Sequence, residues 1–211
     1  KGILELNKVR LYIMKTKRLK RFIYSFFVYS MAVQTIMLVA VYFGTKEVNW
    51  GEGANAKMGL IIGVLLIQLI AIPGAILLSK ISKFKGNLFA LKLVVFIWIL
   101  LCLSAFLVYE PIHFYLISGF VGLVMGGIQS LSRSTYSKYI PSGTKDTSSF
   151  FSFYDISEKL GIVIGMFSYG FIEQITGSMR NSIVALVVFF IVGLLLLFQV
   201  PKEEISIENY G

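Results

Sequence analysis

Charged residues are scarce in this sequence, and their scarcity excludes the commonest class of protein. Asp, Glu, Lys and Arg make up 15% of the 211 residues, against roughly 25% in a soluble globular domain. So few charges cannot supply the polar surface that a soluble domain of this size needs. A single cysteine, Cys102, excludes a small secreted domain held together by disulfides. A hydrophobic content of 56% excludes a disordered chain.

The residue combinations that enzymes use are also missing. The chain has one histidine, His113, and it shows no carboxylate–histidine metal cluster and no Ser/His/Asp set. It has no glycine-rich phosphate loop beside a strand. We therefore expect no catalytic residues, no metal and no cofactor. We also expect no nucleic acid partner, because the basic residues are better explained by membrane topology.

The sequence does contain a series of long apolar stretches bounded by charge, proline or glycine. A helix that spans the bilayer needs about 20 predominantly apolar residues, whereas the strands of membrane barrels have about ten. Helices also satisfy their own backbone hydrogen bonds in lipid. The pattern predicts an all-α membrane protein in contact with the lipid bilayer, with six transmembrane helices at 22–43, 58–79, 88–108, 111–133, 148–172 and 181–200.

The distribution of Lys and Arg predicts the orientation of these helices. Fifteen basic residues lie in the arm 1–21, in the connections after the second and fourth stretches, and in the tail, against three on the other side. The positive-inside rule then places both termini in the cytoplasm. We predict a basic cytoplasmic arm at 1–21, a six-helix bundle at 22–200 and a cytoplasmic tail at 201–211, in the inner or plasma membrane of a cell.

Polar side chains within the stretches follow an order that repeats after three helices. The stretches 88–108 and 183–200 are nearly pure Leu, Val, Ile and Phe, whereas the other four carry glutamine or charged residues. Two units of three helices have opposite orientations because three is odd, and such inverted repeats build many secondary transporters. We therefore predict two inverted three-helix repeats, in which 88–108 and 183–200 are peripheral, face lipid and contact the fewest other helices.

Small residues also recur at helical spacing. Glycines four residues apart allow two helix backbones to approach closely, and such pairs occur in three of the polar stretches. They are Gly59 and Gly63, Gly122 and Gly126, and Gly161 and Gly165.

Four uncharged polar residues are candidates for a substrate cavity, because transporters bind substrate near the bilayer midplane. An amide offers donors and an acceptor to a polar or zwitterionic solute. Alternatively, these side chains only join helices through hydrogen bonds. The candidates are Gln34, Thr35, Gln68 and Gln129. We predict that the three glutamines point to one common face, opposite 88–108 and 183–200.

Four charged residues are candidates for a network that gates the cytoplasmic end: Arg133, Asp155, Glu158 and Lys159. A charge within a span is costly and marks a functional hypothesis. Asp155 and Lys159 are one helical turn apart, so they can instead neutralise each other. Arg133 and Asp155 lie at similar depth on either side of a short connection, so we expect Arg133 to pair with Asp155 or Glu158. The alternatives are that Arg133 contacts lipid phosphate or holds a substrate carboxylate.

Several strings resemble the C-terminal half of the vacuole-effluxer family of the major facilitator superfamily. They are Phe-Phe-Val-Tyr-Ser at 26–30 with Val-Gln-Thr at 33–35, Gln-Leu-Ile-Ala-Ile-Pro-Gly-Ala at 68–75, and Gly-Gly-Ile-Gln-Ser-Leu-Ser-Arg-Ser at 126–134 followed by Ile-Pro at 140–141, Phe-Phe at 150–151, Tyr-Asp at 154–155 and Lys159. The family includes fungal autophagy-related vacuolar amino-acid exporters and bacterial proteins of unknown substrate.

The resemblance implies the last six helices of a twelve-helix transporter that moves a small polar solute by alternating access, with amino-acid efflux as one possibility. The expected partners are the missing N-terminal six-helix half or a second copy of the chain, together with an unknown small-molecule substrate. The sequence starts at Lys1 rather than Met, so we expect a fragment of a longer protein, a dimerising half or an excised folding unit. The competing hypothesis is an integral-membrane assembly subunit without transport activity.

Overall fold

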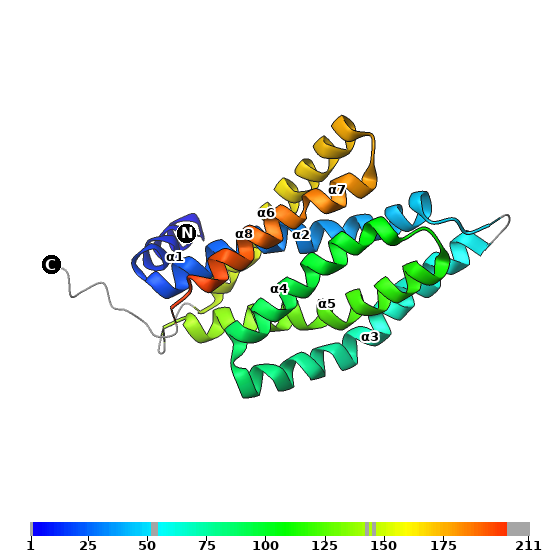
Figure 1. The fold of residues 1–211 in the computed structure, drawn as a ribbon. Coiled ribbons are helices and arrows are strands. Elements are labelled where there is room, and N and C mark those ends of the chain that lie inside the picture. The colour runs from blue at the N-terminus through cyan, green and yellow to red at the C-terminus, as the bar shows by residue number, and fades with distance from the viewer. Residues whose placement is uncertain (1, 52–54, 142–143, 145–146, 202–211) are drawn as a thin grey trace.

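The fold is a bundle of long helices (Figure 1). The computed structural model describes residues 2–51, 55–141, 144 and 147–201, and these contain helices and no strand. Lys1, Lys145, Lys202 and the rest of the predicted tail lie outside the described residues. The elements are α1 (Gly2–Lys15), α2 (Lys17–Glu47), α3 (Asn55–Lys85), α4 (Asn87–Ser104), the 3-10 turn η1 (Ala105–Leu107), α5 (Pro111–Tyr139), α6 (Thr147–Thr176), α7 (Met179–Ala185) and α8 (Val187–Phe198).

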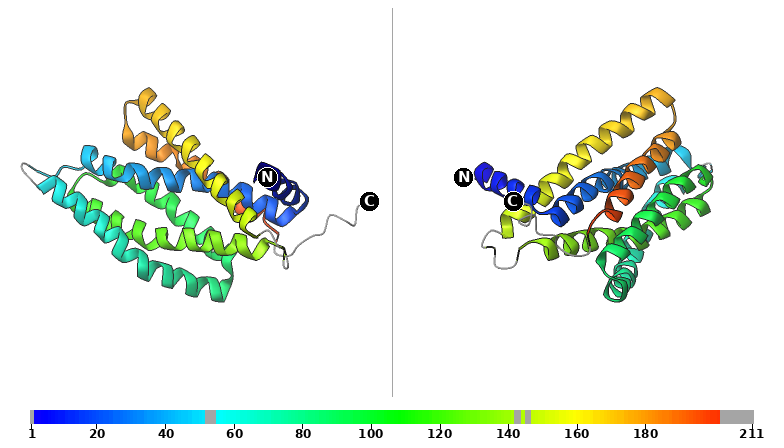
Figure 2. Two further views of the ribbon diagram at one scale, coloured as in Figure 1. Left: turned by 180° about the vertical axis from the view of Figure 1, so that it is seen from behind. Right: turned by 60° about the vertical axis from the view of Figure 1, so that its left-hand side comes forward.

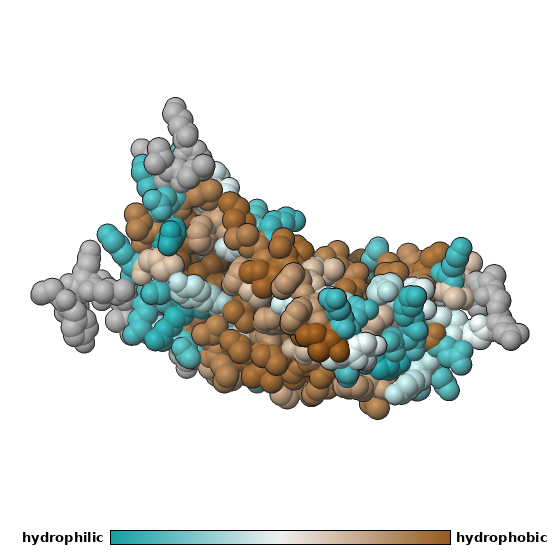
Figure 3. All heavy atoms as spheres, turned by 90° about the horizontal axis from the view of Figure 1, so that it is seen from above, coloured by the Kyte–Doolittle hydropathy of each residue, from teal (hydrophilic) through white to brown (hydrophobic). Residues whose placement is uncertain are grey.

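Five helical segments are long and apolar enough to cross a bilayer. They are α2, α3, α4 with η1, α5, and α7 with α8. The remaining predicted span lies in α6, which has 30 residues but carries Asp155, Glu158 and Lys159; its place in the membrane stays a proposal. The face in Figure 3 shows a broad apolar belt with hydrophilic side chains towards both ends. The protein is therefore a multi-pass helical membrane protein.

The helices form two groups, one of α2, α6 and α8 and the other of α3, α4 and α5. Helix α2 packs mainly against α6 and α8, whereas α5 packs mainly against α3 and α4. Figure 2 shows α6, in yellow, and α8, in red, beside the blue α2, with the green and cyan helices grouped together. The two groups meet where α4 packs against α8 and α2 against α5.

The basic arm is helical and belongs partly to the bundle. Helix α1 packs against α6 and α2, with Val9 and Ile13 buried. The Tyr12 and Phe150 rings meet edge to face, with centroids 5.6 Å apart. The next helix begins at Lys17, inside the segment 1–21 that was predicted as the arm.

The prediction that 88–108 and 183–200 contact the fewest helices is wrong. Helix α4 contacts α3, α5 and α8, and the Trp98 ring stacks on Phe190 of α8 with centroids 5.7 Å apart. In their most apolar stretches, 39% of residues are buried in α4 with η1 and in α7 with α8, against 11% in α3. The physical reason is that large apolar side chains fill the middle of this bundle, whereas α3 turns much of its apolar surface outwards.

Two of the three predicted glycine pairs include close approaches to a neighbouring helix backbone, whereas Gly59 and Gly63 face the rings of Trp50 and Phe114. A Cβ atom added to Gly122 would lie 2.5 Å from the carbonyl oxygen of Ile67, and one added to Gly126 would lie 2.7 Å from that of Ala71. Both contacts join α5 to the backbone of α3. Gly165 on α6 approaches the backbone of Met31 on α2 in the same way. Because such contacts leave no room for a side chain, these glycines determine how closely the helices approach.

Candidate functional site

A hydrogen bond joins two of the predicted site residues across α2 and α6. The amide nitrogen Nε2 of Gln34 donates to Oε1 of Glu158 over 2.7 Å, in a half-buried position. Gln34 lies near the middle of α2 and Glu158 in the first half of α6. A carboxylate that accepts a hydrogen bond from a neutral amide keeps further acceptor capacity. The pair can therefore accept an ammonium group or another donor of a polar solute.

Arg133 lies within ion-pair distance of Asp155, as expected. Nη1 of Arg133 is 3.5 Å from Oδ1 of Asp155, and the two side chains are 56% and 47% exposed. The guanidinium group also lies over the rings of Phe151 and Tyr154, at 5.1 and 5.9 Å from their centroids. Lys159 is exposed and forms no ion pair within the part of the chain that the structure describes. Asp155 therefore pairs across helices rather than with Lys159 one turn away.

A group of aromatic side chains joins α2, α5 and α6 in the region of these two polar contacts. The hydroxyl groups of Tyr29 and Ser132 share a buried hydrogen bond of 2.7 Å between α2 and α5. Phe26 stacks on Tyr154 with centroids 4.1 Å apart, which joins α2 to α6. The Tyr136 hydroxyl donates to the backbone oxygen of Phe150 over 2.8 Å. These contacts join α2, α5 and α6 to one another near Glu158 and Asp155.

The remaining cavity candidates are not gathered into one contact. Gln129 is exposed, and its Nε2 lies 3.8 Å from the sulfur of Met37, one turn after Gln34. Gln68 is also exposed and lines a cavity together with Met37. No hydrogen bond joins the three glutamines to one another among the described residues, so their common face stays a prediction. Thr35 is fully buried and donates to the backbone oxygen of Met31, so it lies inside the α2–α6 interface.

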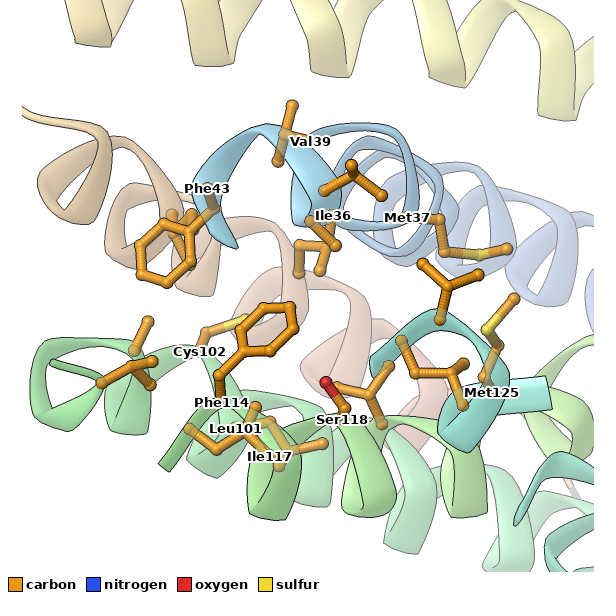
Figure 4. Close-up of a pocket in the computed structure, with 18 of the residues that line it drawn as sticks. Ile36, Met37, Val39, Phe43, Leu101, Cys102, Phe114, Ile117, Ser118 and Met125 are labelled. Carbon is orange, nitrogen blue, oxygen red and sulfur yellow. The ribbon is translucent and has the colours of Figure 1, made fainter. Parts of the chain in front are cut away.

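The cavity beside Gln68 measures about 230 Å³ and is almost wholly apolar. Figure 4 shows Ile36 and Phe43 of α2, Cys102 of α4 and Phe114 of α5 converging on it. The Ser118 hydroxyl is one of few polar groups in its wall. It lies between the two helix groups rather than at the Gln34–Glu158 pair. Among the described residues, no group of three His, Cys, Asp or Glu side chains is placed to hold a metal ion.

The shorter and more buried of the two salt bridges between described residues was missed from the sequence. Arg180, counted above only as a topology charge, is 8% exposed at the start of α7. Its Nε lies 2.7 Å from Oε2 of Glu47 at the end of α2. Its Nη1 and Nη2 donate to the backbone oxygens of Ala105 and Val108 over 2.9 and 2.6 Å. We call Arg180 and Glu47 the outer clasp. The pair joins the end of α2, the segment 105–108 and the start of α7, at the end of the bundle away from Arg133.

The sequence carried one signal for the outer clasp. Glu47 and Arg180 stand at the ends of predicted spans on the side that has few charges. Two opposite charges at the same membrane boundary are candidates for a pair. No local sequence motif links the two residues, since they lie 133 positions apart.

A multi-pass bundle of closely packed helices, of which some carry charged side chains, is an architecture that membrane transporters use. The family model described as "Vacuole effluxer Atg22 like" matches residues 2–208. The chain belongs to this family, which is one of transporters rather than enzymes.

Curated relatives agree with this membership. The chain is 28% identical over 183 residues to the "Uncharacterized MFS-type transporter YxiO" of Bacillus subtilis, covering 86% of this chain and 41% of the relative. It is 26% identical over 186 residues to "Autophagy-related protein 22" of Pichia angusta, covering 83% of this chain and 32% of the relative. The chain thus spans less than half the length of these relatives. No solved structure matches it at a significant level.

Proposed function

We propose that the chain forms one half of a secondary transporter that moves a small polar solute by alternating access. The hydrogen bond between Gln34 and Glu158 carries this proposal. An ionisable group within an apolar helix costs free energy and is a functional hypothesis by default. An amide beside a carboxylate suits a zwitterion, because it offers a donor together with acceptors. Amino acids, and their efflux, are the first case to test, since vacuolar amino-acid exporters belong to the family that the sequence resembles.

The pairing of helices supports an inverted repeat with α6 as a sixth span. If α2, α3 and α4 correspond to α5, α6 and α8, then the α2–α6 and α2–α8 contacts correspond to α5–α3 and α5–α4. The first helix of each unit therefore packs mainly with the last two helices of the other. This exchange is expected of two units related by a pseudo-two-fold axis. The proposed repeat does not require α4 and α8 to be peripheral helices.

The exposed apolar faces of α3 and α6 support the presence of a partner that covers them. Leu69 and Ile72 of α3 are 67% and 64% exposed, and Val163 and Phe167 of α6 are 67% and 74% exposed. Because relatives are more than twice as long as the matched segment, we propose that an N-terminal half covers these faces. A second copy of this chain is the alternative occupant.

Removing the negative charge of Glu158 is expected to impair transport. The full-length protein in proteoliposomes would be assayed for counterflow of a panel of labelled amino acids. Glu158→Gln removes the charge of the acceptor and Gln34→Leu removes the donor, so each should lower the rate roughly tenfold, about the contribution of a hydrogen bond to a charged group. Glu173→Gln, a carboxylate change on the same helix, is the matched control and should stay within about twofold of the unmodified protein.

Two outcomes would contradict the proposed function. If no amino acid and no other small solute of the panel is transported by the unmodified protein, the assembly-subunit hypothesis gains support. If Glu158→Gln transports as well as Glu173→Gln, the Gln34–Glu158 pair only joins helices.

Removing Arg133 is expected to open the end of the bundle that carries it. The Arg133–Asp155 pair is half exposed, so it stabilises the closed arrangement by about 1 kcal/mol, a shift of roughly fivefold in population. With Cys102 buried, a cysteine placed at Ser157 reports access. Arg133→Ala should raise about fivefold the rate at which this cysteine is labelled from the side of the membrane with more basic residues. Arg133→Lys should raise that rate less. An unchanged rate would reduce Arg133 to a topology charge.

A further inference from the structure

A second, larger cavity lies at the end of the bundle where α3 ends and α4 begins. It measures about 1100 Å³ and is bounded by the ends of α3, α5 and α8 and the starts of α2 and α4. Five basic side chains line it, and we call it the basic pocket: Arg18, Lys83, Lys85, Lys92 and Lys138. It is separate from the Gln34–Glu158 pair and from the apolar cavity.

The walls of the basic pocket that the structure describes carry charges of one sign only. None of the described residues that line it is Asp or Glu. Like charges held around one cavity repel one another and raise the positive potential inside it. An anion that enters the pocket removes this cost and gains attraction from several cations at once.

Hydrogen bonds hold one side of the basic pocket in place. Oδ1 of Asn87 accepts from Ser82 Oγ over 2.6 Å and from Lys138 Nζ over 3.0 Å. Nδ2 of Asn87 donates to Ser134 Oγ over 3.3 Å. Asn87 therefore joins the ends of α3 and α5 and positions the Lys138 ammonium group. Each lysine ammonium has three donors, so Lys138 retains donors for a ligand.

Arg18, at the start of α2, supplies a further donor to the basic pocket. Its guanidinium group lies 4.1 Å from the centroid of the Tyr139 ring. Its Nε is buried and has no hydrogen-bond partner among the described residues. A buried donor without a partner carries a desolvation cost that an oxygen ligand removes. Arginine also matches the oxygen geometry of phosphate better than lysine does.

The rim of the basic pocket is apolar and exposed. Phe89 of α4 and Phe198 of α8 line it and are 43% and 63% exposed. Lys85 lies 4.9 Å from the Phe89 ring centroid, and Lys92 lies 4.3 Å from that of Phe198. Cations beside exposed aromatic rings at a helix end are suited to the boundary between headgroups and acyl chains. The rim thus favours a ligand that carries both phosphate and hydrocarbon.

We propose that the basic pocket binds a phosphate-bearing anion, supplied as the headgroup of an anionic lipid in the adjacent leaflet. Lys83, Lys85 and Lys138 provide attraction, and the Arg18 guanidinium group binds phosphate oxygens. The acyl chains lie along Phe89 and Phe198. This site does not depend on the proposed transport function, because it uses none of the same residues.

The test is a titration of the purified full-length protein in detergent with short-chain phosphatidylglycerol, phosphatidylcholine and inorganic phosphate. Phosphatidylglycerol should bind much more tightly than the other two. In the triple variant Lys83→Gln/Lys85→Gln/Lys138→Gln, its affinity should fall roughly a hundredfold, since each nearby basic residue contributes roughly a factor of five to binding of anionic lipid. The matched control Lys8→Gln/Lys15→Gln/Lys80→Gln removes the same charge outside the pocket and should retain most of the affinity.

Three results would overturn the proposal. Equal losses in the two triple variants would mean that surface charge alone attracts the lipid. Equal affinity for phosphatidylcholine would mean that the anion is not recognised. Equal affinity for inorganic phosphate would assign the site to a soluble phosphate compound rather than to lipid. If the triple variant fails to fold, Lys83→Arg/Lys85→Arg/Lys138→Arg and the single variant Lys85→Gln keep the test decisive, since the first should bind normally and the second more weakly.

Discussion

Replacing Gly122 with alanine is expected to force α3 and α5 apart and to destabilise the protein. The new Cβ would lie 2.5 Å from the carbonyl oxygen and 3.0 Å from the Cα of Ile67. Both are backbone atoms of a helix, so neither can move without moving α3. Overpacking of this kind costs about 2 kcal/mol. Thermal unfolding of the full-length protein in detergent should show a clearly lower midpoint, and Gly122→Leu should fold poorly.

Gly170→Ala is the control, because a Cβ atom at Gly170 meets nothing within 4 Å. Alanine is favoured over glycine in a helix by up to about 1 kcal/mol. The control should therefore unfold at the same temperature as the unmodified protein or a higher one. A Gly122→Ala protein that is as stable as Gly170→Ala would show that the backbones of α3 and α5 are further apart than the contact of Gly122 with Ile67 requires.

Replacing Arg180 with methionine is expected to have the larger effect on stability. The change leaves Glu47, 24% exposed, without its cation and leaves the backbone oxygens of Ala105 and Val108 without a donor. Breaking a buried ion pair by removing one partner costs about 3 to 5 kcal/mol. Unfolding experiments should show this loss, and a cysteine at the end of α7 should become easier to label.

Three variants test whether the stability loss in Arg180→Met comes from the outer clasp itself or from the removal of any positive charge. Lys46→Met removes an exposed cation next to Glu47 and should leave stability unchanged within about 0.5 kcal/mol. Arg180→Lys should recover part of the stability, because one ammonium group cannot reach all the acceptors. The double variant Arg180→Met/Glu47→Leu should be more stable than Arg180→Met alone, since no carboxylate is then left unpaired. Additive losses in the double variant would show that the two side chains do not interact.

The candidate site shows how far single residues could be predicted. The depth of Arg133 and Asp155 along their helices was enough to predict their contact, because both lie close to one short connection. Their exposure was not predictable, and it reduces the expected energy of the pair from several kcal/mol to about 1 kcal/mol. Thr35 was assigned to a cavity by its position beside Gln34, but its side chain is fully buried and donates to a backbone oxygen of its own helix. The partner of Gln34, Glu158, is 124 residues away, and no local pattern indicates it.

The sequence by itself determined the class of the protein and the positions of its helices. Long apolar stretches admit only helices in lipid, because each helix satisfies its own backbone hydrogen bonds. Glycines four residues apart marked the close contact of α5 with α3, because spacing along one helix is a local property, but the same spacing at Gly59 and Gly63 marked none. Only the tertiary structure decided which helices lie inside. Apolar helices such as α4 and α8 can face lipid or one another equally well, since lipid tails and leucine side chains are both apolar. The same holds for Arg180 and the basic pocket, whose charges are brought together by helices that lie far apart in the sequence.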